Sequence, residues 1–483
     1  MNKHKLNSLL RRNLTVNWAK SEGELDLRYH SLGIGGIHSM PAPATVVEKT
    51  ALLKPRSVRI FLQEFFYVYP ATGVYDWAKL DAYMDAVHAM VAGNVRSAHC
   101  AYGGDIMASI CLKPNALYPI VDETIWQPND VAQWQELIHQ LVLRYSKEKN
   151  YVTHWAIANE QNIGETGGCP YLITNPDDYF EYYKITAAPI IEALPNVKVG
   201  GPSHAGGGEG AAQFLERFIE LCKRENIKVD FTCYNAYCDD PARHVHSGRT
   251  IRNAIDKHDP SVELYMTEFN VDLIDELSVE EEAYDPRRAA SLASSILALH
   301  EDGCLNGSYQ YHIYDQFCDP AEFAPWYAKT RYMAEHWSDL AHRLGLFDMD
   351  GKARPQYYMY KLLYEMTGTR AGMCGTDNIL RGIASQCERG SMSIFLANFA
   401  VRSTPDAISL FQFENAKSGL YRLNVYRIDE NTAADMKATP TRGLAPTESR
   451  VVYIHPDFHF HVYTPADSVT LVQLTPQTPQ ISP

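Results

Sequence analysis

The chain has 483 residues, of which 46% are hydrophobic and 21% are charged, and its formal net charge is −14. This length exceeds that of one small domain and accommodates a barrel of about 250 residues together with a smaller module. The negative charge argues against nucleic acid and other polyanions as partners. No apolar run reaches the roughly 18 residues of a membrane span, so we expect no membrane partner either.

The N-terminal segment and the cysteines indicate a compartment. Met1 to Asn13 is basic but lacks an apolar core, which argues against a signal peptide. The ten cysteines show no repeated CxxC spacing and favour reduced thiols over a disulfide scaffold. These features predict a cytoplasmic protein, and they leave the oligomeric state open, a homo-oligomer included.

Strand-like and helix-like segments alternate from about residue 30 to residue 315. The expected strands are Leu32–Ile37, Ser57–Leu62, Val95–His99, Tyr151–Ala158, Val197–Gly200, Lys228–Tyr234, Val262–Thr267 and Ser308–Ile313. Between them, apolar residues recur at helical spacing near residues 77–91, 131–145, 214–222 and 287–300. Eight such units favour an α/β fold closed as a (β/α)8 TIM barrel. A doubly wound open sheet is the second choice, because no Gly-rich phosphate loop opens a helix.

The pattern changes after Gly368. Five segments then alternate apolar and polar residues, which predicts an antiparallel β-sandwich: Ser391–Ala400, Ala407–Phe413, Tyr421–Ile428, Arg450–His455 and Ser468–Leu474. We therefore expect residues 1–368 to form the catalytic barrel and residues 369–483 to form a C-terminal accessory β-sandwich domain, which the first residues of the chain could join.

Two carboxylates stand out as catalytic candidates. Glu160 follows the apolar run that begins at Thr153, and Glu268 follows the run that begins at Leu264. Barrel enzymes place catalytic groups at strand ends, and paired carboxylates hydrolyse glycosidic bonds. The two glutamates are 108 residues apart, which is three steps of 36. With roughly 31 residues or more per βα unit, this spacing predicts the ends of strands four and seven.

Polar neighbours suit the same chemistry. Asn159 could bond the sugar 2-hydroxyl, a bond that strengthens in the transition state. A nucleophilic carboxylate must stay ionised, and Arg59 and Tyr237 are placed to donate to Glu268. The alternatives are an ordinary ion pair on the barrel rim for Arg59 and core packing for Tyr237.

Three further residues are candidates for the sugar pocket. Tyr311, on the eighth strand, would supply an aromatic floor, although core packing explains it nearly as well. His38 and His99 could bond sugar hydroxyls, and structural roles remain open for both. His459 and His461 share a strand face, but they lie in the sandwich segment, so we expect no metal site there.

The motifs, taken in order, resemble those of glycoside hydrolase family 39, a clan A family that includes β-xylosidases and α-L-iduronidases. The matching segments are Asn159-Glu160-Gln161-Asn162, Val199-Gly200-Gly201-Pro202, Val229-Asp230-Phe231, Thr267-Glu268-Phe269-Asn270, Gly345 to Asp348, Lys352 to Pro355, Tyr426 to Asp429 and Val469 to Val472. The resemblance thus extends over most of the chain.

The chain departs from the family pattern at three positions around the expected pocket. Gln161 stands where the family usually has Pro, Asn235 where the sixth strand usually offers His, and Tyr311 where the eighth strand usually has Trp. These departures affect the expected substrate more than the expected mechanism.

The resemblance implies a retaining glycoside hydrolase with Glu268 as nucleophile and Glu160 as acid/base. Asn159, Arg59, Tyr237, Asn235, Tyr311, His38 and His99 would bind substrate, and no cofactor or metal is required. The expected substrate is a carbohydrate, first a neutral xyloside or arabinoside cleaved by exo action. The alternatives are an endo-acting glycanase or a uronidase of the same clan, an inactive carbohydrate-binding protein, and a structural scaffold.

Overall fold

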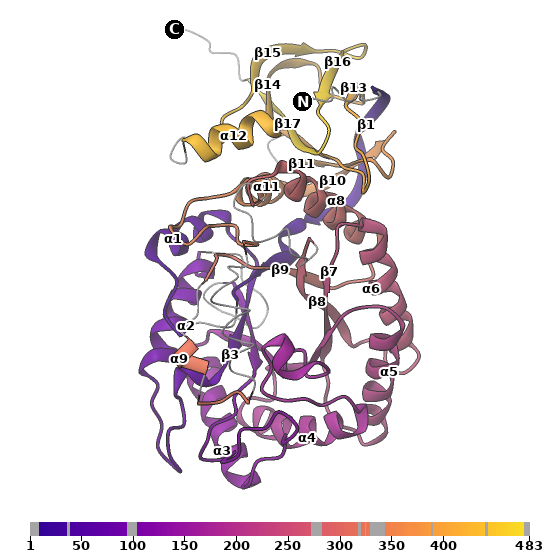
Figure 1. Ribbon diagram of the computed structural model, residues 1–483. Coiled ribbons are helices and arrows are strands. Elements are labelled where there is room, and N and C mark those ends of the chain that lie inside the picture. The colour runs from indigo at the N-terminus through magenta and orange to yellow at the C-terminus, as the bar shows by residue number, and fades with distance from the viewer. Residues whose placement is uncertain are drawn as a thin grey trace.

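The computed structural model describes residues 9–35, 39–93, 104–271, 283–316, 320–323, 325–328, 343–387, 390–439 and 443–477. Eight parallel strands close into a barrel, because the last of them pairs with the first (Figure 1). They are β2 (His30–Gly33), β3 (Ser57–Leu62), β4 (Asp105–Ile110), β5 (Val152–Ile157), β6 (Lys198–Ala205), β7 (Phe231–Tyr237), β8 (Glu263–Asn270) and β9 (Gly307–Tyr311). The closed barrel confirms the predicted fold class and excludes the doubly wound open sheet.

The predicted third strand was wrong. The position between β3 and β5 is taken by β4, whose six residues are all buried. The segment Val95–His99 lies outside the described residues. Both segments are short, but β4 offers Ile106 and Ile110, whereas Val95 is the single β-branched residue of the other segment.

Helices follow the strands and form the outer ring of the barrel (Figure 1). They are α1 (Ala44–Leu53), α2 (Ala78–Val91), α3 (Val131–Val142), α4 (Pro176–Ala193), α5 (Glu209–Arg224), α6 (Pro241–Asp256), α8 (Pro286–Asp302), the short α9 (Pro320–Phe323) and α11 (Pro355–Leu363). Short 3-10 helical turns also occur at Leu27–Tyr29, Glu64–Phe66 and Gly164–Gly167. A π-helical turn, Leu143–Glu148, extends α3.

Local sequence sets several helix boundaries. Before α8, the side chain of Asp285 accepts a hydrogen bond from the N–H of Arg287, Pro286 takes the first helical position, and Gly303 ends the helix at a φ of 73°. Asn175 and Asp240 cap α4 and α6 in the same way, each ahead of a proline. Within the described ranges, every helix falls short of the length and apolar character that a membrane span needs.

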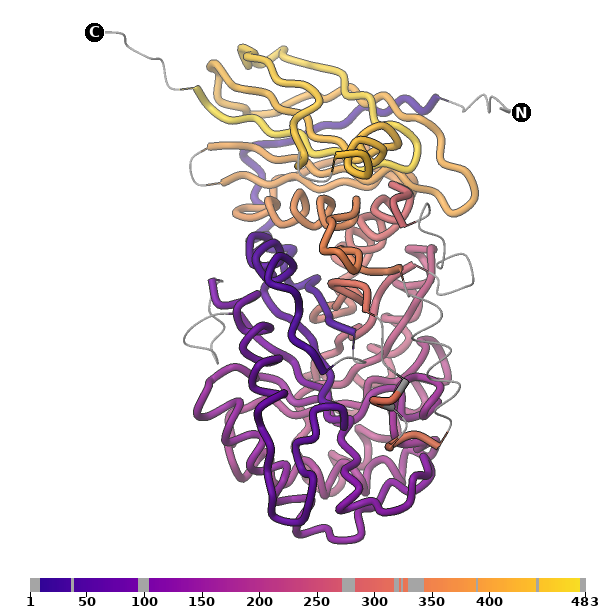
Figure 2. Tube along the Cα trace, turned by 60° about the vertical axis from the view of Figure 1, so that its left-hand side comes forward, coloured from indigo at the N-terminus to yellow at the C-terminus, as the bar shows by residue number. Residues whose placement is uncertain are grey.

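The remaining strands form one accessory sheet above the barrel (Figures 1 and 2). They are β1 (Leu10–Asp26), β10 (Thr367–Cys374), β11 (Leu380–Gln386), β12 (Met392–Asn398), β13 (Ala407–Glu414), β14 (Gly419–Ile428), β15 (Glu448–Ile454), β16 (His459–Thr464) and β17 (Ser468–Pro476), and a helix, α12 (Glu430–Ala438), follows β14. The strand order is β15-β14-β17-β12-β11-β10-β1-β13-β16, and every pair is antiparallel except β1 with β13. The sheet therefore draws on both ends of the chain.

The accessory sheet curls so that its two arms face each other across a second apolar core. Trp18, on β1, packs edge-on against Tyr421, on β14, with ring centroids 5.6 Å apart, although four other strands separate β1 from β14 in the sheet order. The helices α8 and α11 lie between the barrel and the sheet (Figure 2) and share a core with Phe395 and Leu471.

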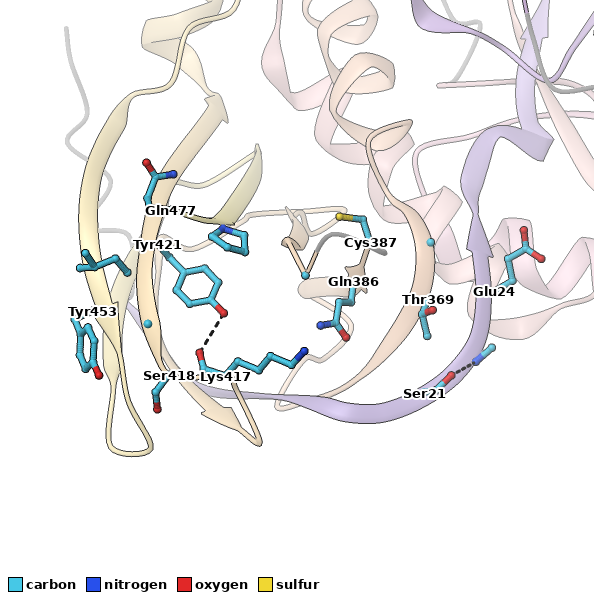
Figure 3. A pocket seen from close by; sticks show the side chains of 16 residues that line it. Ser21, Glu24, Thr369, Gln386, Cys387, Lys417, Ser418, Tyr421, Tyr453 and Gln477 are labelled. Atoms are coloured by element: carbon cyan, nitrogen blue, oxygen red, sulfur yellow. Dashed lines mark hydrogen bonds between the residues drawn. The ribbon is translucent and has the colours of Figure 1, made fainter. Parts of the chain in front are cut away.

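A cavity of about 1300 Å³ opens at the end of the accessory sheet (Figure 3). Its lining includes Thr369, Gln386 and Lys417, together with Tyr421, whose hydroxyl donates to the carbonyl of Lys417 at 3.1 Å. No barrel strand contributes to the lining, so this cavity is separate from the catalytic candidates.

Candidate active site

The two candidate carboxylates lie at the carboxyl ends of the fourth and seventh barrel strands. Glu160 follows the last residue of β5, Ile157, by three positions, and Glu268 lies near the end of β8. Side chains at this end of a TIM barrel converge on a common pocket. Hydrogen bonds through Arg59, Asn159 and Asn235 connect the two groups.

Glu268 is held by two donors. Arg59, on β3, donates from Nη1 to Oε1 at 2.8 Å, and the hydroxyl of Tyr237, at the end of β7, donates to Oε2 at 2.5 Å. Burial and the adjacent charge of Glu268 hold the pKa of Tyr237 well above its usual range, so its hydroxyl stays a donor. Each oxygen of Glu268 thus has one partner, which fixes the plane of the carboxylate.

Arg59 joins Glu268 to the segment that carries Glu160. The Arg59 side chain is fully buried, and its Nη2 donates to Oδ1 of Asn159 at 2.6 Å and to Oγ of Ser109 at 3.2 Å. A buried guanidinium needs such partners, because water cannot replace them. The planar fork of Arg59 therefore sets the relative position of β3, β5 and β8.

The backbone around Glu160 is held in an uncommon conformation. Ala158 has a φ of 65° and Glu160 a φ of 48°, values that cost non-glycine residues of order 1 kcal/mol or more. The N–H of Glu160 donates to the carbonyl of Ser203, on β6, at 2.7 Å, which anchors this turn. Strain that the surrounding structure holds in place is characteristic of functional sites.

Space beside Glu160 depends on a glycine. A Cβ atom built at Gly167 would lie 2.2 Å from Oε2 of Glu160, far inside contact distance. Oε1, in contrast, accepts a hydrogen bond from Nδ2 of Asn235 at 2.8 Å. The two oxygens of Glu160 thus have different surroundings.

Asn235, predicted as a substrate-binding residue, is engaged with protein groups. Besides Glu160, its Nδ2 donates to Oδ1 of Asn159 at 3.2 Å, and its Oδ1 accepts from the hydroxyl of Thr267 at 2.8 Å. The side chain is 1% exposed. Its contacts therefore run to the candidate catalytic side chains.

The electrostatic surroundings favour the protonated form of Glu160. Burial, and next the charge of Glu268, raise the pKa of Glu160 to about 8, against the lowering effects of Asn235 and Arg59. Glu268 instead pairs with a permanent cation. The two carboxyl groups thus differ in the way that an acid and a nucleophile must differ.

Tyr311 lies beside this pair. Its ring is nearly perpendicular to that of Tyr237, with centroids 6.2 Å apart, and it stacks on His312. Burial, then the charges of Glu268 and Glu160, raise the pKa of Tyr311 well above its usual range. The structure therefore brings Arg59, Asn159, Asn235, Tyr237 and Tyr311 together with both carboxylates. His38 and His99 lie outside the described residues.

Sequence reasoning missed three contributors: Ser109, Gly167 and Thr267. Ser109 was missed because it lies on β4, the strand that was misplaced. Thr267 was missed because alternation along a strand points it away from Glu268. The register pairs Tyr234 with Met266 and Asn235 with Glu268, so Thr267 is the extra residue of a β-bulge. A bulge of this kind leaves no sequence signal.

Gln161, which departs from the family pattern, is fully buried, and its amide has no hydrogen-bond partner among the described residues. The side chain of Asn162 instead makes two hydrogen bonds to Ala205, on β6. It donates to the carbonyl of Ala205 and accepts from the N–H of Ala205. Within the same described ranges, no group of three or more His, Cys, Asp or Glu residues is arranged to hold a metal ion.

A TIM barrel that joins a half-buried carboxyl group of raised pKa to an arginine-paired carboxylate through hydrogen bonds has the architecture of a glycoside hydrolase. The profile described as "Glycosyl hydrolases family 39" matches residues 118–378, more than half of the chain. The chain belongs to glycosyl hydrolase family 39. A curated relative, the β-xylosidase of Geobacillus stearothermophilus, is 28% identical over 114 residues, which cover 23% of this chain and 21% of the relative.

Solved structures of similar fold cover nearly the whole chain. A monomeric β-xylosidase from Caulobacter crescentus CB15 matches with a TM-score of 0.72 and 18% identity, over 97% of this chain and 100% of the other. A family 39 enzyme from Xanthomonas axonopodis pv. citri matches with a TM-score of 0.71 and 18% identity, over 98% of each. The bacterial orthologue of human α-L-iduronidase matches with a TM-score of 0.69 and 14% identity, over 98% of this chain and 85% of the other. At these identities the likeness concerns the fold.

Proposed function

We propose that the protein is a retaining glycoside hydrolase that cleaves by double displacement. The observation that carries the proposal is that two carboxyl groups in one hydrogen-bonded cluster have different surroundings. Glu268 is paired with Arg59 and Tyr237, whereas the pKa of Glu160 is raised to about 8. The group paired with an arginine is suited to attack carbon, and the group of raised pKa to donate a proton.

The match to family 39 supports a retaining mechanism, and one barrel strand, β7, holds both carboxyl groups. Asn235 contacts Glu160 and Tyr237 contacts Glu268, and these two side chains are two residues apart on β7. Side chains two residues apart on a strand lie on the same face, so β7 supports both groups from one side. Retaining enzymes hold the two groups about 5–5.5 Å apart, and inverting enzymes hold them farther apart.

In the proposed reaction, Glu268 attacks the anomeric carbon while Glu160 protonates the departing oxygen. The bond from sugar to leaving group breaks, and an ester bond to Glu268 forms. Esterification removes the charge of Glu268, which had raised the pKa of Glu160. Glu160 can then take a proton from the water that releases the sugar.

For substrate, we propose exo action on a neutral xyloside or arabinoside. The sequence match to a β-xylosidase supports this choice. Arg59 is a buried cation beside the carboxylates, but it already donates hydrogen bonds to Glu268 and Asn159. It is therefore poorly placed to bind the carboxylate of a uronic acid. An endo-acting glycanase and a uronidase of the same clan are the second choices.

A panel of nitrophenyl glycosides tests the activity, with both arabinosides, β-xyloside, β-galactoside and a uronide, and with Glu160→Ala and Glu268→Ala as controls. We expect release from one neutral pentoside, lost in the Glu268 variant. Release that persists in both variants would overturn the assigned roles of the two glutamates, and no release from the panel and from polysaccharides would overturn the activity and leave a binding protein.

We also propose a cytoplasmic location, supported by six buried cysteines that are free thiols: Cys111, Cys169, Cys222, Cys233, Cys238 and Cys304. Cell fractionation with an antibody tests it. Recovery of the intact protein from the medium or the periplasm would contradict the proposal.

A further inference from the structure

The amide of Asn235 can adopt only one orientation in its surroundings. Arg59 carries donors alone, so the Asn159 atom that faces it at 2.6 Å is the oxygen. That oxygen also faces Asn235 at 3.2 Å, so Asn235 presents its nitrogen there. Its oxygen consequently faces Thr267, whose hydroxyl donates to it at 2.8 Å. The Thr267 hydroxyl also lies 3.4 Å from the carbonyl of Tyr234, but its shorter bond is the one to Asn235.

This orientation decides what Asn235 does for Glu160. The nitrogen of Asn235 can only donate, and it reaches Oε1 of Glu160 at 2.8 Å. In a neutral carboxyl group the carbonyl oxygen is the better acceptor, so a donor at Oε1 favours the proton on the other oxygen. Oε2 is that oxygen, and it lies close against Gly167, where any Cβ atom would come within 2.2 Å of it.

We propose that Asn235, with its amide oriented by Thr267, is the positioning residue that holds Glu160 by Oε1 and leaves Oε2 to transfer the proton. The relay runs from the Thr267 hydroxyl through the Asn235 amide to Glu160. It is neutral throughout, so it keeps one orientation while the carboxyl group gains and loses its proton. The inference rests on the proposed acid/base role of Glu160.

The β-bulge of β8 makes the relay geometrically feasible. On a regular strand Thr267 and Glu268 would point to opposite faces. Because the bulge adds Thr267 to the register, both side chains are buried and both reach groups of the barrel interior. One local irregularity thus supplies both the nucleophile and the first donor of the relay.

A titration of carbon-13-labelled glutamate, followed by NMR, tests the relay without relying on turnover. Comparison with Glu160→Gln assigns the signal of Glu160. In Asn235→Ala the ionised form of Glu160 loses a donor, so we expect its proton affinity to rise about tenfold. Thr267→Val removes the hydroxyl at nearly constant shape and should raise the affinity in the same direction.

Thr232→Val is the matched control. Thr232 lies on β7 like Asn235, is fully buried, and its hydroxyl has no hydrogen-bond partner among the described residues. The proposal is overturned if Thr267→Val titrates like Thr232→Val, or if Asn235→Ala leaves the titration of Glu160 unchanged. If Asn235→Ala does not fold, the comparison of the two threonine variants decides.

Kinetics supply a second readout. If the relay positions the acid, the loss of kcat/KM in Thr267→Val grows as the leaving group becomes poorer. A general structural defect would instead lower kcat/KM by the same factor for every substrate. Wild-type protein that cleaves no glycoside would refute the proposed function, and the titration would still judge the relay.

Discussion

Replacement of Arg59 by methionine is the sharpest perturbation of the site, because it keeps the bulk of the side chain and removes its charge. Arg59 is fully buried, and Glu268 is 5% exposed, so water cannot take over the lost bonds at 2.8 Å to Glu268 and 2.6 Å to Asn159. Breaking a buried ion pair by removing one partner costs about 3–5 kcal/mol. We expect a loss of this size in the free energy of unfolding, together with loss of turnover.

The assay is urea unfolding at neutral pH, with the change taken from midpoints at a common slope. Arg59→Lys is the control for charge, since its ammonium cannot fork to Glu268 and Asn159 together. The double variant Arg59→Met, Glu268→Met removes the buried charge altogether and should regain most of the stability without activity. A single methionine variant as stable as wild type, or a double variant no more stable than the single one, would refute the reasoning.

Three further predictions concern the acid/base side of the site. The value of kcat/KM should fall as the pH rises through about 8, where Glu160 loses its proton, and a pH profile without this limb would contradict the assignment. The folded protein holds a proton on Glu160 that the unfolded chain releases near pH 4.5, so the free energy of unfolding should fall as the pH rises from about 4.5 to 8. Unfolding curves of Glu160→Gln should lack this fall, so the variant should gain stability relative to wild type over the same pH range. Gly167→Ala should lower kcat by about 100-fold or more, because its Cβ overlaps Oε2 of Glu160, and a fully active alanine variant in the same assay would show that this oxygen needs no space there.

Local patterns were sufficient to predict the barrel and its carboxylates. The runs that end at Glu160 and Glu268 are apolar, short and followed by polar residues, and the structure places them in β5 and β8, the fourth and seventh strands. Arg59 could be placed for the same reason, because it lies in an apolar strand where an unpaired cation would be costly.

Features that depend on distant pairing could not be predicted. The bulge at Thr267 is visible only in the register between β7 and β8. The pairing of β1 with β13 joins Leu10 to Ala407, far apart in the chain, so the expectation that the first residues could join the accessory domain could not name their partner strand. The positive φ angles near Glu160 likewise result from the barrel around it, since its sequence contains no glycine there.

The central claim, that Glu268 is the nucleophile of a retaining enzyme, is tested most directly by trapping the glycosyl-enzyme. A panel of dinitrophenyl pentosides with fluorine in place of the C2 hydroxyl would be incubated with the protein and followed by intact mass and peptide mapping. We expect one added glycosyl group on the peptide that contains Glu268, and none on the Glu268→Gln variant. An adduct on another residue, or turnover of the parent glycoside with inversion at the anomeric carbon by NMR, would contradict it.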